Sequence, residues 1–273
     1  MTEQDTLARL RQSLACIEGR KRAGTELPDR FALDVGAIDA ALGGGLPRRA
    51  VHEVFAAAMA DSGAACGFGL GLALRMTAMA SAAVATSATS QGRPIVWVQQ
   101  AMAMRQHGIL NPGGLIEFGA SPSLIVIEAC DALQALRAAH EAVRCAALGA
   151  VVMELWGPAR ALGLAESRRL SLAAAGSGVG LVVLRLDASP QPSAAFSRWS
   201  VAAAPSVALE AAAPGHPCFD LDLLRHRGGL ESGRWRVEWN RDQLVFRQPA
   251  LSGAVVSFPS HRPAGAAAWR DVG

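Results

Sequence analysis

The residues best placed to do chemistry lie in a short loop between an expected strand and an expected helix. The sequence predicts a strand over 51–55, a loop of small residues, and a helix over 66–87. This arrangement binds phosphate when the loop and the helix N-terminus point backbone N–H groups at the anion. The residues at the phosphate-binding position are Asp61, Ser62, Gly63, Ala64 and Ala65.

This loop lacks the groups that nucleotide hydrolysis needs. A P-loop ends in Gly-Lys-Ser/Thr, in which the ammonium group contacts the terminal phosphates and the hydroxyl binds Mg²⁺. Here Ala64 and Ala65 follow Gly63, and Asp61 adds a negative charge near the phosphate position. Of the 26 basic residues, Lys21 is the single lysine. We therefore expect neither ATP hydrolysis nor Schiff-base catalysis.

Other catalytic and metal-binding patterns are also missing. The 5 cysteines form no Cys-x-x-Cys pair, and the 6 histidines form no His-Glu-x-x-His pair. Residues 176–178 read Gly-Ser-Gly and lack the Gly-x-Ser-x-Gly pattern of a nucleophile elbow. The sequence predicts no metal site, no cofactor and no catalytic residue. Cys66, Cys130 and Cys145 lie among apolar residues and are expected to be buried reduced thiols.

The elements around the loop alternate between strands and helices. Apolar runs predict strands over 94–98, 150–155 and 180–186, and apolar periodicity predicts helices over 131–148 and 166–175. Repeated strand–helix–strand units imply a mainly parallel sheet that is covered by helices on both faces. The expected fold class is therefore α/β.

The core is expected to end in an antiparallel hairpin. Apolar and charged residues alternate over 219–224 and again over 234–239. Trp235, Val237 and Trp239 share one face and are expected to be buried, which places the arginines on the solvated face. These arginines are candidates for DNA contact, although we expect indirect contact to be favoured. They are Arg225, Arg227, Arg234 and Arg236.

Segments outside the core complete the expected domain organisation. Residues 1–28 are predicted to form an amphipathic helix and a linker, residues 29–248 the core domain, and residues 249–273 a flexible tail. The apolar stripe of the helix either folds back onto the core or docks against another protein. The stripe consists of Leu7, Leu10, Leu14 and Ile17.

Residues 35–55 resemble the beginning of the RecA core, in which a helix and a Gly-Leu-Pro turn precede the P-loop strand. The turn is Gly45-Leu46-Pro47 in this chain. The resemblance implies that Gly63 stands at the last P-loop glycine, Ala64 at the lysine and Ala65 at the hydroxyl residue. It therefore implies a RecA-like fold with a degenerate nucleotide site.

The same resemblance implies that the other catalytic positions of RecA are altered. Residues 99–101 read Gln-Gln-Ala where RecA carries its catalytic glutamate, and Glu154 stands at the aspartate of the Walker B strand. Arg185 and Leu186 stand at the sensor amide. The resemblance thus implies a protein that is not an enzyme.

Among RecA relatives, the chain is most similar to the ImuA family, over residues 33–240. The resemblance is carried by His52-Glu53-Val54 and by segments 45–47, 93–97, 142–152, 167–170, 194–199, 223–229 and 235–239. It implies an accessory protein of translesion synthesis in the SOS response to DNA damage. The implied partners are ImuB, which resembles a polymerase but lacks its activity, RecA, and an error-prone DNA polymerase.

Two other functions remain open from the sequence. The first is a cell-division inhibitor resembling SulA, which binds a tubulin-like ring protein; the second is a residual RecA-like ATPase. The N-terminus has no basic region ahead of an apolar one, and no stretch is apolar enough to cross a membrane. We therefore expect a soluble, cytoplasmic protein with no membrane contact.

Overall fold

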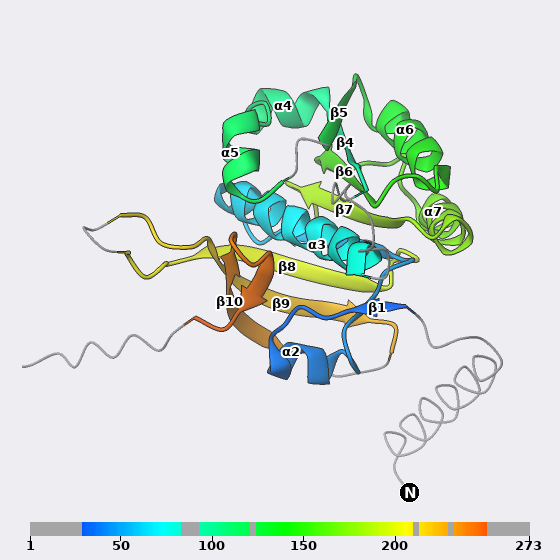
Figure 1. Ribbon diagram of the computed structural model, residues 1–273. Helices are drawn as coiled ribbons and strands as arrows, with labels where there is room; N and C mark the ends of the chain where they lie inside the picture. Colours follow the sequence, from blue (N-terminus) through cyan, green and yellow to red (C-terminus); the bar gives the residue numbers. More distant parts are fainter. Residues whose placement is uncertain (1–28, 83–92, 121–123, 210–212, 229–231, 250–273) are drawn as a thin grey trace, which may run out of the picture.

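The computed structural model describes residues 29–82, 93–120, 124–209, 213–228 and 232–249 (Figure 1). Within these residues a 9-stranded sheet carries helices on both faces, and a 2-stranded sheet pairs β1 with β2. The predicted N-terminal helix and nearly all of the predicted tail lie outside the described residues.

The bounds of the elements are as follows. The strands are β1 (Arg30–Phe31), β2 (Leu46–Pro47), β3 (Val51–Ala56), β4 (Ile95–Gln100), β5 (Leu124–Ala129), β6 (Ala150–Trp156), β7 (Gly180–Leu186), β8 (Ser197–Ala204), β9 (Cys218–His226), β10 (Arg234–Asn240) and β11 (Val245–Arg247). The helices are α2 (Gly36–Ala41), the 3-10 helix η1 (Met59–Asp61), α3 (Ser62–Ala82), α4 (Ala101–His107), α5 (Pro112–Glu117), α6 (Ala132–Arg144) and α7 (Leu164–Ser177).

The large sheet joins a parallel half to an antiparallel half. Its strand order is β11-β10-β9-β8-β3-β7-β6-β4-β5. Neighbouring strands are parallel from β8 to β5 and antiparallel from β8 to β11. The chain therefore has the RecA-like α/β core expected from the sequence, and the predicted antiparallel end is confirmed.

Two apolar layers hold the helices against the sheet. On one face, α3 packs with Val152, Val182 and Leu184 in a core cluster that continues under β8 to β11. On the other face, α6 and α7 pack over the alternate positions of the same strands, including Val151 and Met153. Strands that are buried on both faces read as continuous apolar runs, which explains why β6 and β7 were recognisable in the sequence.

Two glycines let α3 approach the sheet closely. A Cβ added to Gly69 would lie 2.5 Å from Leu184 Cδ2, and one added to Gly71 would lie 2.5 Å from Phe246 Cζ. Because real Cβ atoms do not approach other atoms so closely, any larger residue would push the helix away from the sheet. The glycines therefore serve packing rather than dinucleotide binding.

The structure differs from the sequence analysis at several elements. Helix α3 begins at Ser62, ahead of the predicted start at Cys66. Strands β1, β2, β8 and β11 were not predicted. The omission of β8 has a physical reason, because Ser197 and Arg198 are polar but buried, each held by a hydrogen bond to β3. Polar residues inside a sheet break the apolar pattern on which strand prediction depends.

The cysteine prediction was wrong at two positions. Cys130 and Cys145 are exposed, Cys66 is partly buried and Cys218 is buried, and all four are free thiols. Cys130 lies just before α6 and Cys145 just after it, where the chain meets solvent despite its apolar neighbours. Within the described residues, no helix is long and apolar enough to span a lipid bilayer.

A buried hydrogen-bonded chain ties β8 to β3 through the ring of His52. The Trp199 indole N–H donates to Ser197 Oγ (2.9 Å), and the Ser197 hydroxyl donates to His52 Nδ1 (2.7 Å). The His52 Nε2–H donates to the Pro47 carbonyl at 3.0 Å. The ring therefore carries one proton, and its complete burial lowers the pKa of His52 to about 4.

We predict that this protein loses stability as the pH falls from about 6.5 to about 4. The pKa values of His52 and His226 are both lowered from 6.5 to about 4, in each case first by burial. Over this window the unfolded chain binds more protons than the folded chain, so acid favours unfolding. Each histidine costs up to about 1.4 kcal/mol per pH unit. Urea unfolding at a series of pH values measures the slope.

Two substitutions test whether His52 causes this loss of stability at low pH. His52→Gln removes one titrating ring and should reduce the slope by about half, according to the same proton balance. Gln106→Ala, at an exposed position of α4, removes no titrating group and should leave the slope unchanged. An unaltered slope in His52→Gln would show that His52 does not titrate in this window.

Candidate functional site

The candidate loop lies where β3 ends and α3 begins, at the carboxyl edge of the parallel strands. Residues 57–61 make this connection, and η1 forms its second half. The five sequence-predicted residues are contiguous here: Asp61 ends η1, and Ser62, Gly63, Ala64 and Ala65 form the first turn of α3. The strand–loop–helix arrangement expected from the sequence is therefore present.

The carboxylate of Asp61 binds backbone donors of the loop and of the neighbouring strand. Its Oδ2 accepts a hydrogen bond from the N–H of Ala58 at 3.1 Å. Its Oδ1 accepts one from the N–H of Ala203 at 2.8 Å. The loop N–H of Ala57 donates to the Val201 carbonyl at 2.9 Å. Two of the N–H groups at this loop are thus already satisfied by the protein itself.

The following residues offer little to a ligand. The Ser62 side chain is buried, and its hydroxyl donates to the Met59 carbonyl at 2.7 Å. A Cβ added to Gly63 would meet nothing within 4 Å, so no close backbone cradle requires glycine here. Ala65 is buried in the core that packs α3 onto the sheet.

A nucleoside triphosphate, which the RecA-like fold implies, does not fit these residues. The Asp61 carboxylate has taken the N–H of Ala58, and its charge repels phosphate. Ala64 and Ala65 supply neither an ammonium group nor a metal-binding hydroxyl. The carboxylate of Asp61, which belongs to the loop itself, thus occupies the place of a bound anion.

Glu154, at the Walker B position, is completely buried in the middle of the sheet. Its Oε2 accepts a hydrogen bond from Trp97 Nε1 at 2.8 Å, and its Oε1 accepts from His107 Nε2 at 2.8 Å. Gln99 Nε2 lies 3.4 Å from the same Oε1. Three side chains therefore surround this carboxylate, which has no free path to a metal ion.

The environment of Glu154 includes groups that the sequence analysis missed. Trp97 and His107 come from β4 and from the last turn of α4, and no spacing rule links them to β6. Burial raises the pKa of the Cys66 thiol well above its ordinary value, and the charge of Glu154 raises it further. The pair therefore offers no nucleophile at neutral pH.

Arg185, at the sensor position, lies in a second buried polar group. It is 3% exposed, and its guanidinium lies over the Phe55 ring at 5.7 Å. On β8, which lies on the far side of β3, Arg198 Nε donates to Glu53 Oε2 at 2.7 Å. Burial lowers the pKa of Arg185, although the charge of Glu53 opposes this effect. These groups hold β3, β7 and β8 together.

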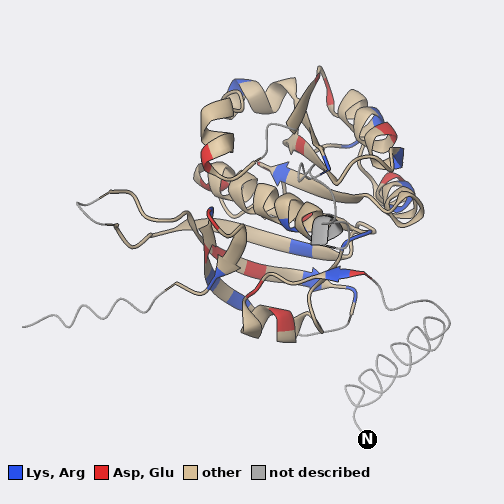
Figure 2. Cartoon of the chain, in the orientation of Figure 1, with Lys and Arg blue, Asp and Glu red and all other residues tan. Residues whose placement is uncertain are grey.

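The four hairpin arginines lie on β9 and β10 or beside them, and two of them are paired with acids. Arg236 makes two hydrogen bonds of 2.7 Å to Asp220, and Arg234 lies 2.9 Å from Asp222. The Arg236 guanidinium lowers the pKa of Asp220. Figure 2 shows acidic and basic positions on these neighbouring strands. Arg225 and Arg227 are exposed at the end of β9.

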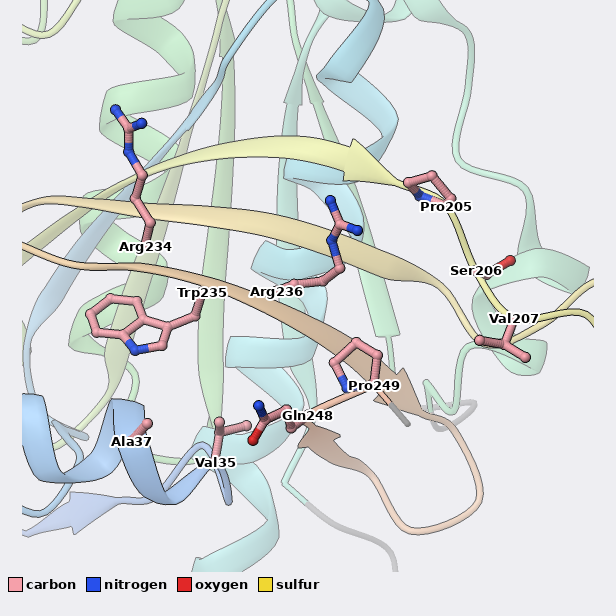
Figure 3. A pocket seen from close by; sticks show the side chains of 10 residues that line it. All are labelled: Val35, Ala37, Pro205, Ser206, Val207, Arg234, Trp235, Arg236, Gln248 and Pro249. Atoms are coloured by element: carbon pink, nitrogen blue, oxygen red, sulfur yellow. The ribbon is translucent and has the colours of Figure 1, made fainter. Parts of the chain in front are cut away.

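The other face of the hairpin is apolar, as predicted. Val237 and Trp239 are fully buried, whereas Trp235 is half-buried. Figure 3 shows the Trp235 ring directed toward α2 while Arg234 and Arg236 extend away from it. The ring lines a hollow of about 650 Å³ together with Val35 of the chain before α2. Within the described residues, no group of three or more His, Cys, Asp or Glu side chains is placed to hold a metal ion.

Comparison with known proteins identifies the family. No protein-family model matches the chain. The chain is 32% identical over 209 residues to Protein ImuA of Caulobacter vibrioides, in strain NA1000 / CB15N and equally in strain ATCC 19089 / CIP 103742 / CB 15. The match covers 73% of this chain and 72% of either relative.

This chain belongs to the ImuA family. The family expected from the sequence is therefore confirmed. Membership connects the chain with mutagenesis induced by DNA damage. The internally bonded Asp61 and the buried Glu154 are thus features of an ImuA protein with a RecA-like core.

We predict that Asp61→Ala destabilises the fold without changing its architecture. The substitution leaves the N–H groups of Ala58 and Ala203 without their acceptor, which costs about 1–2 kcal/mol in the free energy of unfolding. Urea unfolding measures this change. Asp242→Ala, at an exposed position of the turn before β11, is the matched control and should cost much less. Equal losses in both variants would contradict the role given to Asp61.

We also predict that ATP with Mg²⁺ does not bind at the loop. Backbone amide resonances of residues 58–65 should keep their chemical shifts when the nucleotide is added, because Asp61 already fills the acceptor position. Two-dimensional ¹⁵N NMR of the full chain distinguishes binding at this loop from binding elsewhere, because each backbone amide gives its own signal. A large, saturable shift at Gly63 would show a seated nucleotide and contradict the prediction.

Proposed function

We propose that this ImuA protein is a non-catalytic accessory protein of a translesion synthesis assembly and acts through contacts with other proteins. The partners are an ImuB-like polymerase-related protein, RecA and an error-prone DNA polymerase. Its RecA-like core is then a scaffold that keeps its fold without a nucleotide. The assembly copies past lesions after DNA damage.

The closed loop carries this proposal. In a protein that uses ATP, the N–H groups at the strand–loop–helix junction are kept free for phosphate. Here Asp61 accepts from Ala58 and Ala203 and satisfies them permanently. A loop whose N–H groups are bound by its own carboxylate offers little to a phosphate group, which supports an action through surfaces.

Exposed apolar side chains near the β5 edge of the sheet support contacts with proteins. Ile109 is 73% exposed and Ile116 is 63% exposed, on and just before α5. Ile125 and Val126 are also exposed on β5, the last strand of the sheet, which pairs only with β4. Figure 1 shows α4, α5 and β5 at the same end of the molecule. Grouped apolar exposure of this kind is typical of protein-binding surfaces.

The hairpin arginines favour indirect rather than direct contact with DNA. Arg234 and Arg236 each hold an aspartate on the neighbouring strand, so a phosphate group would have to displace a formed ion pair. A further pair joins Arg247 to Glu238 at 3.8 Å. Arg225 and Arg227 are the exposed arginines of the hairpin that make no ion pair among the described residues, and two such charges are few for binding to a phosphate backbone.

We predict that the N-terminal stripe is needed for partner binding. Leu10→Asp combined with Leu14→Asp places two charges on the predicted apolar face. In a pull-down, the full-length variant should recover at least about tenfold less RecA or ImuB than the wild type. The reason is that each buried leucine contact contributes about 1.5 kcal/mol or more to binding. Ala8→Asp combined with Gln12→Asp adds the same charge on the opposite face and is the control.

A second pair of variants separates the two surfaces. Ile109→Asp with Ile116→Asp changes the apolar group beside β5 while the stripe stays intact. Loss of partner recovery in either set, with the control unaffected, supports an accessory role. Unchanged recovery of RecA, ImuB and the polymerase in both sets would remove the proposed mode of action.

A further inference from the structure

Arginines gather at the amino ends of the parallel strands, where the proposed function gives them no role. Arg48 and Arg49 come just before β3, Arg93 comes before β4, and Gly178 comes before β7. Because these strands are parallel, the four positions meet at one edge of the sheet. This edge is opposite to the one that holds Asp61. It lies beside β1, at the right of Figure 1.

The three arginines line one pocket of about 410 Å³, which we call the arginine pocket. Gly178, at the end of α7, forms part of its wall, and a Cβ there would lie 3.7 Å from Arg49 Nε. Asp29 is the one acidic side chain among the described residues that line the pocket. Three guanidinium groups thus face a single carboxylate.

Arg48 is a buried cation whose donors are incompletely satisfied. It is 6% exposed; its Nε lies 3.4 Å from Asp29 Oδ1, and its Nη1 donates to the Arg75 carbonyl at 3.2 Å. Its Nη2 is buried and has no hydrogen-bond partner within the part of the chain that the structure describes. A buried cation with an unpartnered donor is incompletely compensated, so negative charge added in the pocket beside it would be favoured.

The charges around Arg48 also favour an added anion. Burial lowers the pKa of Arg48, which Asp29 partly opposes, and Arg75 and Arg49 add repulsion. Arg49 and Arg93 are exposed, and neither takes part in an ion pair among the described residues. Two guanidinium groups are therefore available for a ligand.

We propose that the arginine pocket binds a phosphate group. A guanidinium offers a planar fork of N–H donors, and a phosphate has three or more oxygens that accept from several directions at once. Arg48 and Arg49 line the pocket from the segment before β3 and Arg93 from the segment before β4, which suits a tetrahedral anion better than a planar carboxylate that one arginine already satisfies. The volume falls within the range of small-ligand sites.

Two sources supply this chemistry, namely a small phosphorylated molecule and the backbone of a nucleic acid. Both present the same oxygens to the arginines. A backbone phosphate would place its flanking sugars outside the pocket, over the exposed Arg49 and Arg93. The experiment below separates the two sources.

The test uses the full-length protein and three probes. Inorganic pyrophosphate is titrated by calorimetry, a short single-stranded oligonucleotide by fluorescence anisotropy, and polyglutamate by the same method as a carboxylate probe. Arg49→Glu and Arg93→Glu should each weaken phosphate binding about tenfold or more, since each removes charge-assisted hydrogen bonds. Both side chains are exposed, so the variants are expected to fold, and circular dichroism checks this.

Arg105→Glu is the matched control, since it makes the same charge change on exposed α4, at the other edge of the sheet. The proposal is supported if the phosphate probes still bind to Arg105→Glu but no longer bind to Arg49→Glu or Arg93→Glu. Pyrophosphate binding without the oligonucleotide assigns a small phosphorylated molecule. Oligonucleotide binding that follows the same variants and falls steeply with salt assigns a nucleic acid.

Three results would overturn the proposal. The first is that neither phosphate probe binds to the wild-type protein. The second is that Arg105→Glu weakens binding as much as the pocket variants do, which would make the effect one of net charge. The third is that polyglutamate alone binds in an Arg49-dependent way, which would make the pocket a carboxylate site.

Discussion

The hydrogen bonds of the Asp61 carboxylate decide what the RecA-like core of this protein is able to do. A loop between a parallel strand and a helix exposes backbone N–H groups that need an acceptor, and in a nucleotide-binding protein the phosphate supplies it. Asp61 is an acceptor that never dissociates, and it also reaches the N–H of Ala203 on β8. The loop therefore has an acceptor of its own, which also joins it to β8.

The same principle extends through the interior of the sheet. Glu154 is held by Trp97 and His107, and Glu53 by Arg198, so each buried carboxylate has its donors within the protein. Buried charges are tolerated only when they are paired in this way. Both carboxylates thus make internal contacts between strands of the sheet or between the sheet and α4. Arg48, by contrast, is a buried cation that lines a pocket and has a donor without a partner among the described residues.

Much of the parallel half could be predicted from the sequence because its strands are apolar on both faces. Strands β6 and β7 stood out as continuous apolar runs. The helix predicted over 131–148 matches α6, whose N-cap is Asp131, with Oδ1 accepting the N–H of Gln134 at 2.8 Å. Strand β8 could not be predicted, since Ser197 and Arg198 are polar residues that become buried only through partners on β3.

The candidate site, like the fold, could be predicted from the sequence only in part. The lack of a lysine and of a hydroxyl residue after Gly63 could be read directly, because those groups are defined by adjacent positions. The partners of Asp61 and Glu154 could not, since Ala203 and His107 are brought to them by the order of the strands. The arginine pocket was hidden for the same reason: Arg48 and Arg93 meet only because β3 and β4 run parallel.

The two polar links between β3 and β8 have a consequence for how the sheet is assembled. His52 meets Ser197 on one face, and at the next position Glu53 meets Arg198 on the other face. A shift of this pairing by one residue would turn a charged side chain into an apolar layer and an apolar one out of it. The antiparallel half can therefore pair with β3 in one register only. This register determines which face of the hairpin is exposed to water.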